Sequence, residues 1–390
     1  MRDKLKLHCN VISGYAFSSS DWKNDGIPVI KIGNISNGEG ITENKSLECV
    51  DEAFLDKLDS KYHISNGDIL ISLTGSHVNL PNSMVGRCCR NITDKIYLLN
   101  QRAGKILSFD NTDHNYLYYL LSTKAIKYEI VNRAYGGANQ VNVSPKDILD
   151  IMWEFPDLEA QRKISGVLLK YDDLIENNLA RISLLEKMAS ELYKEWFVRF
   201  RFPGHEAAKF VDGVPEGWTY GVLSDIMIVG AGKTRPESGN RYPVYGGNGI
   251  LDYADDYNDE NSIIIGRVGA YCGSVYYEPS KCWVSDNALY AKSKFNSPLY
   301  TYYLLRSLNL NSRHSGTGQP LITQGLLNKL KTIIAPISLM KEYDNIVSKL
   351  FLQQENLQRQ NHNLTKQRDL LLPRLMSGKL SVEPLLADTA

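Results

Sequence analysis

The chain has 390 residues, 43% hydrophobic and 23% charged, which are ordinary proportions for a globular protein and enough length for two or three domains. Its 44 basic residues balance 44 acidic ones, which argues against a protein that coats DNA through its own charge. The six cysteines show neither C-x-x-C spacing nor a histidine at a zinc-finger interval, which favours reduced thiols over disulfides or zinc.

The N-terminal sequence MRDKLKLHCN contains no apolar signal region, and no apolar run approaches eighteen residues. We therefore expect a soluble protein that is cytoplasmic and does not enter a membrane.

Residues 1–155 alternate short β-like runs with turns, which predicts a β-rich domain. In chain order we expect two strands, a helix, a glycine-rich loop and a last strand, at 27–32, 68–73, 116–132, 135–140 and 148–155.

Residues 156–204 hold a first long helix, predicted over 157–200, and a linker. Apolar residues recur there at alternating steps of four and three, a heptad seam typical of a coiled coil. The seam includes Ile164, Leu168, Ile175, Asn178, Ile182, Leu185 and Leu192. The alternative, two ordinary long core helices in the chain, stays open.

Residues 205–335 repeat the plan of the first domain. The tetrapeptide at 118–121, Tyr-Tyr-Leu-Leu, recurs at 302–305. A second glycine-rich loop lies at 315–319, and Pro336 corresponds to Pro156 before the long helix. A second long helix follows over 336–378, with a tail at 379–390. Its seam includes Leu350, Leu357, Asn361, Leu364 and Leu371.

Catalytic motifs are missing from the sequence. Residues 230–234 end like a phosphate-binding loop, but Met227 stands where its first glycine belongs, so we prefer a flexible basic loop. There is no Pro-Pro pair, no H-E-x-x-H and no G-x-S-x-G, and Glu43-Asn44-Lys45 is isolated. We expect a protein that is not an enzyme.

Several segments occur in an order that is specific as a set: 14–17, 26–35, 67–72, 99–102, 136–140, Pro156 with 159–164, 214–218, 316–320 and Pro336. With these segments the chain resembles the specificity (S) subunit of type I restriction-modification systems over nearly its whole length. It departs from the family at 337–342, which lacks a Glu-Gln pair, and its first domain lacks the Pro-Glu-Gly-Trp lead-in of the second.

The resemblance implies an α/β (α+β) fold with two repeated β-rich target-recognition domains, separated by two long helices packed as an antiparallel coiled coil. Each domain would recognise one half of a bipartite, asymmetric site in double-stranded DNA. The helices would set the gap between the half-sites and dock two methyltransferase (M) subunits, which nuclease/translocase (R) subunits then join. S-adenosylmethionine, ATP and Mg would bind to those partners, and no cofactor or metal to this chain.

Recognition in the major groove needs side chains that present hydrogen-bond donors and acceptors. We expect Thr74, Ser76, His77, Asn79, Arg87, Asn139 and Gln140 to do this in the first domain, and Lys233, Thr234, Arg235, Arg267, Thr317 and Gln319 in the second. Arg133 and Arg313 are candidate phosphate contacts. The alternative for each glycine-rich loop is a simple turn.

Four seam positions are polar, which costs stability but fixes helix register: Asn178, Gln354, Asn361 and Arg368. Charged residues on the outward face of the first helix are candidates for docking M subunits, although any solvated helix shows such a face. They are Arg162, Lys163, Asp172, Glu176, Arg181, Glu186, Lys187 and Lys194.

The balanced charge leads to a further hypothesis, that the M subunits supply most of the phosphate contacts. Two other functions stay open: an assembly scaffold that no longer recognises DNA, and an enzyme that binds a nucleotide at 230–234.

Overall fold

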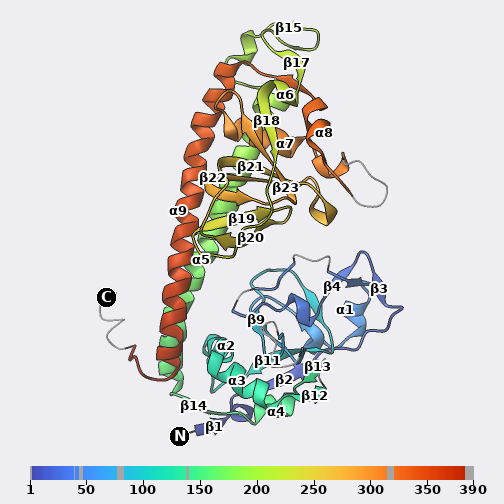
Figure 1. The fold of residues 1–390 in the computed structure, drawn as a ribbon. Coiled ribbons are helices and arrows are strands. Elements are labelled where there is room, and N and C mark those ends of the chain that lie inside the picture. Colours follow the sequence, from blue (N-terminus) through green and yellow to red (C-terminus); the bar gives the residue numbers. More distant parts are fainter. Residues whose placement is uncertain are drawn as a thin grey trace. The chain divides into compact units, whose positions relative to one another are not determined.

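The computed structural model describes residues 2–38, 40–43, 47–76, 83–137, 140–313 and 320–382. The chain forms two compact units, residues 1–176 with 361–390 and residues 177–360, each with its own hydrophobic core. Each unit contains one β-rich domain and one end of each of two long helices, α5 (Leu158–Tyr193) and α9 (Ile337–Met376). The predicted fold is confirmed, because two β-rich domains are separated by two long helices that pack together (Figure 1). The finer five-part division stays a prediction.

The first unit contains two main sheets, with strand orders β2-β11-β7-β9 and β3-β5-β4-β10-β6, and a small sheet of order β12-β13-β8. A short pair, β1-β14, joins the N-terminal strand to the strand that precedes α5. The strands are β1 (Arg2–Lys4), β2 (Cys9–Ser13), β3 (Trp22–Lys23), β4 (Ile27–Ile30), β5 (Cys49–Val50), β6 (His63–Ile64), β7 (Ile69–Ser72), β8 (Thr74–Gly75), β9 (Cys88–Arg90), β10 (Tyr97–Leu99), β11 (Ala103–Ser108), β12 (Tyr135–Gly137), β13 (Gln140–Asn142) and β14 (Met152–Glu154). The helices before α5 are α1 (Phe54–Lys57), α2 (His114–Ser122), α3 (Lys124–Arg133) and α4 (Pro145–Leu149).

Two local predictions in this unit were wrong. The helix expected over 116–132 is interrupted at Thr123, whose extended backbone ends α2 and whose side chain caps α3 by accepting from the Ile126 amide. The strand expected over 148–155 begins only at residue 152. Residues 145–149 are helical because Ser144 and Asp147 form a capping box and Pro145 occupies the first helical turn.

The second unit contains a larger sheet of order β18-β23-β21-β22-β19-β20. Two short pairs, β15-β16 and β17-β24, accompany it. Its strands are β15 (Phe210–Val211), β16 (Val214–Pro215), β17 (Thr219–Val222), β18 (Met227–Ala231), β19 (Tyr242–Gly246), β20 (Gly249–Ala254), β21 (Asp259–Gly266), β22 (Val275–Val284), β23 (Ala288–Ser293) and β24 (Lys331–Ile334). Its shorter helices are α6 (Leu223–Ile226), α7 (Pro298–Ser307) and α8 (Gln324–Lys329).

The repeated tetrapeptide lies on equivalent helices, α2 in the first unit and α7 in the second. All eight of its residues are buried in the two hydrophobic cores. Its repetition therefore reflects a shared packing role.

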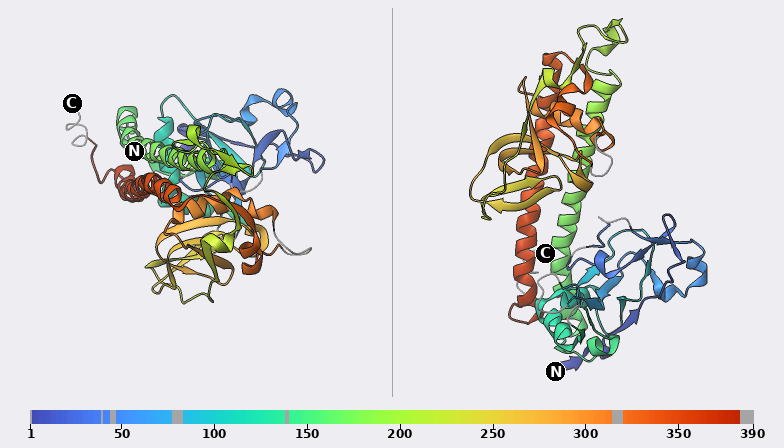
Figure 2. Two further views of the ribbon diagram at one scale, coloured as in Figure 1. Left: turned by 90° about the horizontal axis from the view of Figure 1, so that it is seen from above. Right: turned by 45° about the vertical axis from the view of Figure 1, so that its right-hand side comes forward.

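Helices α5 and α9 lie side by side in every view of the ribbon (Figures 1 and 2). They run antiparallel, because Asp172 contacts Arg368 in one unit while Ala189 accepts a hydrogen bond from Tyr343 at 2.9 Å in the other. Every predicted seam residue is buried or half-buried. Among the polar ones, Asn361 donates to the carbonyl oxygen of Ile175 at 3.3 Å. Helix α5 ends in a π-helical turn, Lys194–Val198, instead of continuing to residue 200.

The expectation that Asp172 faces outward was wrong. This carboxylate is buried, forms an ion pair with Arg368 at 2.7 Å and accepts a hydrogen bond from the Tyr119 hydroxyl. Burial alone would lower the pKa of Arg368, but the hydrogen bond and charge of Asp172, followed by those of Asp369, raise it. Asp172 thus joins α5 to α9 and to α2 within the first unit.

A second buried carboxylate, Asp344 on α9, accepts hydrogen bonds from the amides of Leu299 and Tyr300 at 3.1 and 2.8 Å, at the start of α7. Burial raises its pKa to about 6, against the opposing effect of these hydrogen bonds. Because the folded chain favours the neutral acid, the stability that this group contributes is present below about pH 4 and is lost as the pH rises through about 6.

We therefore expect wild-type protein to lose about 2.4 kcal/mol of stability between pH 4 and pH 7 relative to Asp344→Asn, because most of the full effect, at about 1.4 kcal/mol per pKa unit, falls within that range. Urea unfolding followed by tryptophan fluorescence measures this, with the exposed Glu342→Gln as a control. Parallel pH profiles for wild type and Asp344→Asn would contradict the assignment.

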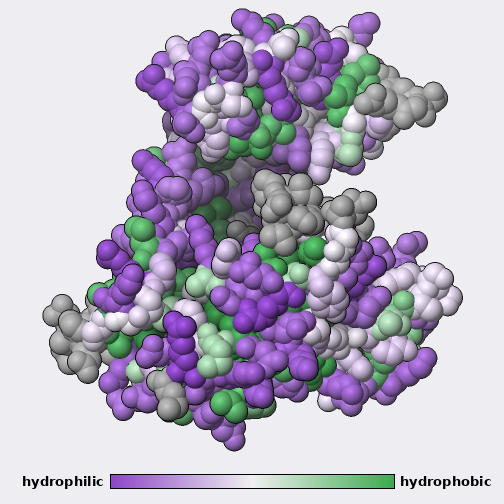
Figure 3. Space-filling model, turned by 60° about the horizontal axis from the view of Figure 1, so that its bottom comes forward, coloured by the Kyte–Doolittle hydropathy of each residue, from purple (hydrophilic) through white to green (hydrophobic). Residues whose placement is uncertain are grey.

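All six cysteines are buried and free, and burial raises the pKa of Cys9 and of Cys89 to about 12. On the face drawn in Figure 3, hydrophilic side chains predominate and hydrophobic ones form small groups between them. None of the helices in the described ranges has the length and apolar character needed to cross a membrane.

Candidate nucleic-acid interface

In the first domain the chain leaves β2 through a position that only glycine fits. The Gly14 amide donates to the carbonyl oxygen of Ala103 at 3.0 Å, and the Tyr15 amide donates to that of Leu99 at 2.8 Å. A Cβ atom on Gly14 would lie 2.3 Å from the carbonyl oxygen of Asn100. A larger side chain would separate these segments, so glycine allows the close contact.

The second domain repeats this arrangement after β18. The Gly232 amide donates to the carbonyl oxygen of Ala288 at 3.1 Å, and the Lys233 amide donates to that of Val284 at 2.9 Å. A Cβ atom on Gly232 would lie 2.0 Å from the carbonyl oxygen of Ser285. The same backbone contact is therefore built twice.

Further hydrogen bonds extend the correspondence. In the first domain the Leu73 amide donates to the carbonyl oxygen of Arg102 at 3.0 Å, and the Leu73 carbonyl oxygen accepts from the Val143 amide at 2.9 Å. In the second domain the Arg267 amide donates to the carbonyl oxygen of Asn287 at 3.1 Å, and the Arg267 carbonyl oxygen accepts from the Ile322 amide at 2.9 Å. We call residues 14–15, 72–75, 99–103 and 141–143 the first loop platform, and residues 232–233, 266–269, 284–288 and 320–322 the second loop platform.

The two loop platforms share a backbone plan but differ in their side chains. Tyr15 corresponds to Lys233 and Leu73 corresponds to Arg267 by the hydrogen bonds above. A common scaffold that carries different polar groups in its loops is the arrangement expected of two sites for different ligands.

The structure brings three predicted residues of the first domain together on neighbouring strands. Val141 and Asn142 of β13 pair with β8, which contains Thr74 and ends next to Ser76. The buried Thr74 hydroxyl donates to the Asn142 side chain at 3.1 Å, and the exposed Gln140 amide donates to the same oxygen at 3.2 Å. The described residues of the first glycine-rich loop, 135–137 and 140, thus lie in paired antiparallel strands. His77, Asn79 and Asn139 lie outside the described residues.

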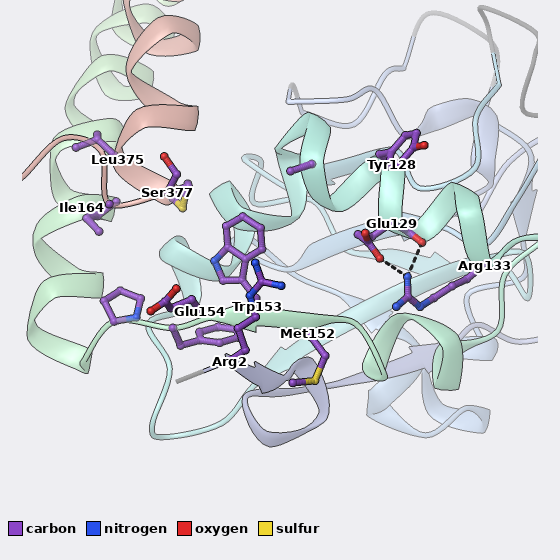
Figure 4. Close-up of a pocket in the computed structure, with 15 residues that line it drawn as sticks. Arg2, Tyr128, Glu129, Arg133, Met152, Trp153, Glu154, Ile164, Leu375 and Ser377 are labelled. Atoms are coloured by element: carbon purple, nitrogen blue, oxygen red, sulfur yellow. Dashed lines mark hydrogen bonds and ion pairs between the residues drawn. The ribbon is translucent and has the colours of Figure 1, made fainter.

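Of the two predicted arginines of the first domain, Arg87 adjoins the first loop platform through its backbone, since its carbonyl oxygen accepts a hydrogen bond from the Ser72 amide at 2.9 Å. Arg87 is half-buried near Lys127, whose pKa is lowered by burial and by the charge of Arg87. Arg133, at the end of α3, is paired with Glu129 along the wall of a cavity of about 750 Å³ (Figure 4). No residue of the first loop platform lines that cavity, so Arg133 belongs to a different surface.

In the second domain, Lys233 and Arg267 both lie on the second loop platform. Lys233 is exposed, and so are Thr234 and Arg235 after it. The Nε atom of Arg267 is buried and has no hydrogen-bond partner among the described residues. Arg313 donates instead to the carbonyl oxygen of Leu308 at 2.8 Å, and Thr317 and Gln319 lie outside the described residues.

The geometry does not support a nucleotide site at 230–234. A phosphate-binding loop connects a strand to the N-terminus of a helix. Here β18 leads into a segment without helix and then into β19, and residues 227–254 contain no helix. Within the described ranges, no group of three or more His, Cys, Asp or Glu side chains is placed to hold a metal ion.

Sequence reasoning missed four exposed side chains on the loop platforms: Gln101, Arg102, Asp286 and Asn287. The available signal was indirect, since residues 99–102 are one of the segments that carry the family resemblance. Only the matched hydrogen bonds place the pair 286–287 at the equivalent position.

Comparison with known proteins agrees with this architecture. The family model described as "Type I restriction modification DNA specificity domain" matches residues 4–187 and 215–366. The chain is 30% identical over 322 residues to the specificity subunit of the type I restriction enzyme MjaIX of Methanocaldococcus jannaschii, covering 73% of each chain. It is 23% identical over 391 residues to the putative MjaX specificity subunit of the same organism, covering 92% of this chain and 88% of that one.

Among solved structures, the chain resembles the S subunit of a type I restriction-modification system from M. genitalium, with a TM-score of 0.56, 17% identity and coverage of 96% of both chains. That likeness concerns the fold, whereas the family match covers most of the sequence. The chain therefore belongs to the specificity subunits of type I restriction-modification systems, which are not catalytic and which recognise DNA through two target-recognition domains.

Proposed function

We propose that this chain recognises a bipartite, asymmetric site in double-stranded DNA, with one domain for each half-site. The observation that supports this most directly is the pair of loop platforms, one on each domain, with matching backbones and different side chains. Two unlike platforms would bind two unlike base sequences, which makes the whole site asymmetric.

The family implies assembly into a type I restriction-modification complex, and the cofactors of these systems belong to the M and R subunits. We further propose that two M subunits dock on the long helices, that R subunits join through them, and that the complex works in the cytoplasm. Several charged residues of α5 already have partners in this chain: Lys163 pairs with Glu159, Glu186 with Arg306, and Lys194 with Glu191. Arg162, Arg181 and Lys187 are exposed and are the better docking candidates.

Replacing residues 1–155 by the same region of a relative tests the proposal. We expect the recognised sequence to change in one half-site only, because the second domain and both helices are retained. Sequencing that detects modified bases, in cells that express the variant with its partner subunits, gives the result. An unchanged pair of half-sites would favour the scaffold function, in which the chain only bridges its partners.

A further inference from the structure

The backbone of the turns at 100–103 and 285–288, one in each loop platform, is held by several hydrogen bonds. Each turn contains an internal backbone hydrogen bond. The Ala103 amide donates to the carbonyl oxygen of Asn100 at 2.9 Å, and the Ala288 amide donates to that of Ser285 at 3.0 Å. Each also receives the strand-end amides described above. The backbone of both turns is therefore fixed on two sides before any ligand binds, which is the preorganisation that precise recognition needs.

The side chains at the tips of these turns are exposed, and they form no polar contact with other described residues. Gln101 and Arg102 occupy the first turn, and Asp286 and Asn287 occupy the second. Within the described part of the chain, none of the four side chains takes part in a hydrogen bond or ion pair. In contrast, Thr74, Gln140, Arg133 and Arg313 each donate to a group of their own domain.

The surroundings of the first turn suit a nucleic acid. Gln101 and Arg102 line a cavity of about 270 Å³ together with Trp22 and Lys31. The Lys31 ammonium lies 3.8 Å from the centroid of the Trp22 ring and pairs with Glu48. An amide and a guanidinium group thus project from a fixed turn beside an aromatic and basic wall.

The second turn has different neighbours. The Ser285 amide donates to the carbonyl oxygen of Tyr245 at 2.9 Å, and in the first domain the Asn100 amide donates to that of Ile30 at 3.1 Å. Gly246 and Gly247, which follow Tyr245, therefore correspond to Lys31 and Ile32, which follow Ile30. Protein atoms already lie against both glycines, because a Cβ atom on the buried Gly246 would be 2.3 Å from the Leu251 side chain, and one on Gly247 would be 3.8 Å from the Cβ atom of Tyr271. Asn287 thus lies near the exposed Tyr271, and the exposed Lys233 forms a β-bridge with Ser285 of the same turn.

We propose that these two turns are the base-recognising elements of the chain, with Arg102 contacting a guanine in the first half-site and Asn287 contacting an adenine in the second. Arginine offers two parallel donors to guanine O6 and N7, and asparagine offers one donor and one acceptor to adenine N6 and N7. Gln101 and Asp286 stand next to them as secondary contacts. This inference rests on the proposed function, because it assigns residues to its two half-sites.

The test uses the full complex, expressed with its partner subunits, and maps modified bases across the genome for Arg102→Ala, Arg102→Lys and Asn287→Ala. We expect Arg102→Ala to weaken discrimination roughly ten- to a hundredfold at one position of the first half-site and to leave the second unchanged. Asn287→Ala should do the reverse, so each variant serves as the control for the other.

Arg102→Lys separates base recognition from phosphate binding. Lysine keeps the positive charge but lacks the two parallel N–H donors of the guanidinium group. We therefore expect Arg102→Lys to lose base discrimination at the same position as Arg102→Ala. A phosphate contact would instead be retained in Arg102→Lys, and its loss in Arg102→Ala would weaken binding to all sequences alike and reduce its salt dependence. That result, or unchanged specificity in the variants, would overturn the inference. If the exchange of residues 1–155 changes one half-site while these variants change neither, the proposed function stands and only the assignment of residues fails.

Discussion

Removing Arg368 from its ion pair with the buried Asp172 is expected to destabilise the first unit by about 3–5 kcal/mol, since the buried carboxylate is left without its counter-ion. Among the residues that the structure describes, Arg368→Ala leaves the Asp172 carboxylate with only Tyr119 as a buried hydrogen-bond donor. Asp172→Ala is expected to cost less, because the half-buried Arg368 guanidinium keeps its ion pair with Asp369 at 2.9 Å. Amide hydrogen exchange in peptides from α2, α5 and α9 measures the local loss of protection.

A double variant provides the sharpest check. Asp172→Leu with Arg368→Met removes both charges, so we expect it to recover most of the stability, because a buried ion pair contributes little beyond a well-packed apolar pair. The matched control is Lys194→Ala, which breaks the exposed pair with Glu191 and should cost no more than about 1 kcal/mol. Equal effects of Lys194→Ala and Arg368→Ala would show that burial does not govern the Asp172 pair.

Deleting one facing heptad from each long helix is expected to shorten the gap between the two half-sites while both remain recognised. Removal of residues 175–181 and 358–364 keeps the alternating steps of the seam and removes the facing pair Asn178–Gln360 together with Asn361–Ile175. Seven residues correspond to about 10 Å of helix, or about 3 base pairs at about 3.4 Å each. Mapping of modified bases gives the new gap.

The control removes four residues from each helix, 175–178 and 361–364. This change shifts the heptad phase, so the apolar positions beyond the deletion turn away from the partner helix and the pair should not form. A seven-residue deletion that folds, methylates DNA and retains the original gap would contradict the proposal that the helices set the gap.

The long helices and the internal repeat could be predicted because both leave regular marks in the sequence. A seam of several heptads and a repeated apolar tetrapeptide depend only on local spacing. The interruption at Thr123 was missed because a threonine within an apolar run becomes a cap only when its backbone turns extended. The outward placement of Asp172 was wrong because its partners, Arg368 and Tyr119, are distant in the sequence.

The candidate site was less accessible from the sequence for a similar reason. Side-chain chemistry drew attention to polar residues near glycines, but it does not show which of them already have partners. Thr74 is held by Asn142 and Arg133 by Glu129, and the first of these contacts forms only when β8 and β13 pair. The turns at 100–103 and 285–288 became visible as equivalents only through non-local hydrogen bonds.

The way in which the chain is divided between its two units has a consequence for synthesis. The second unit is continuous, residues 177–360, whereas the first is completed by residues 361–390. Leu375, Met376 and Val382 pack in the same core as Ile164 and Leu168. At about 5–20 residues per second, a ribosome needs roughly 10–40 s to reach this closing segment after residue 176 has been made. During that interval the nascent first domain exposes apolar surface and the unpaired Asp172, so the unit that begins to be made first is the last to be finished.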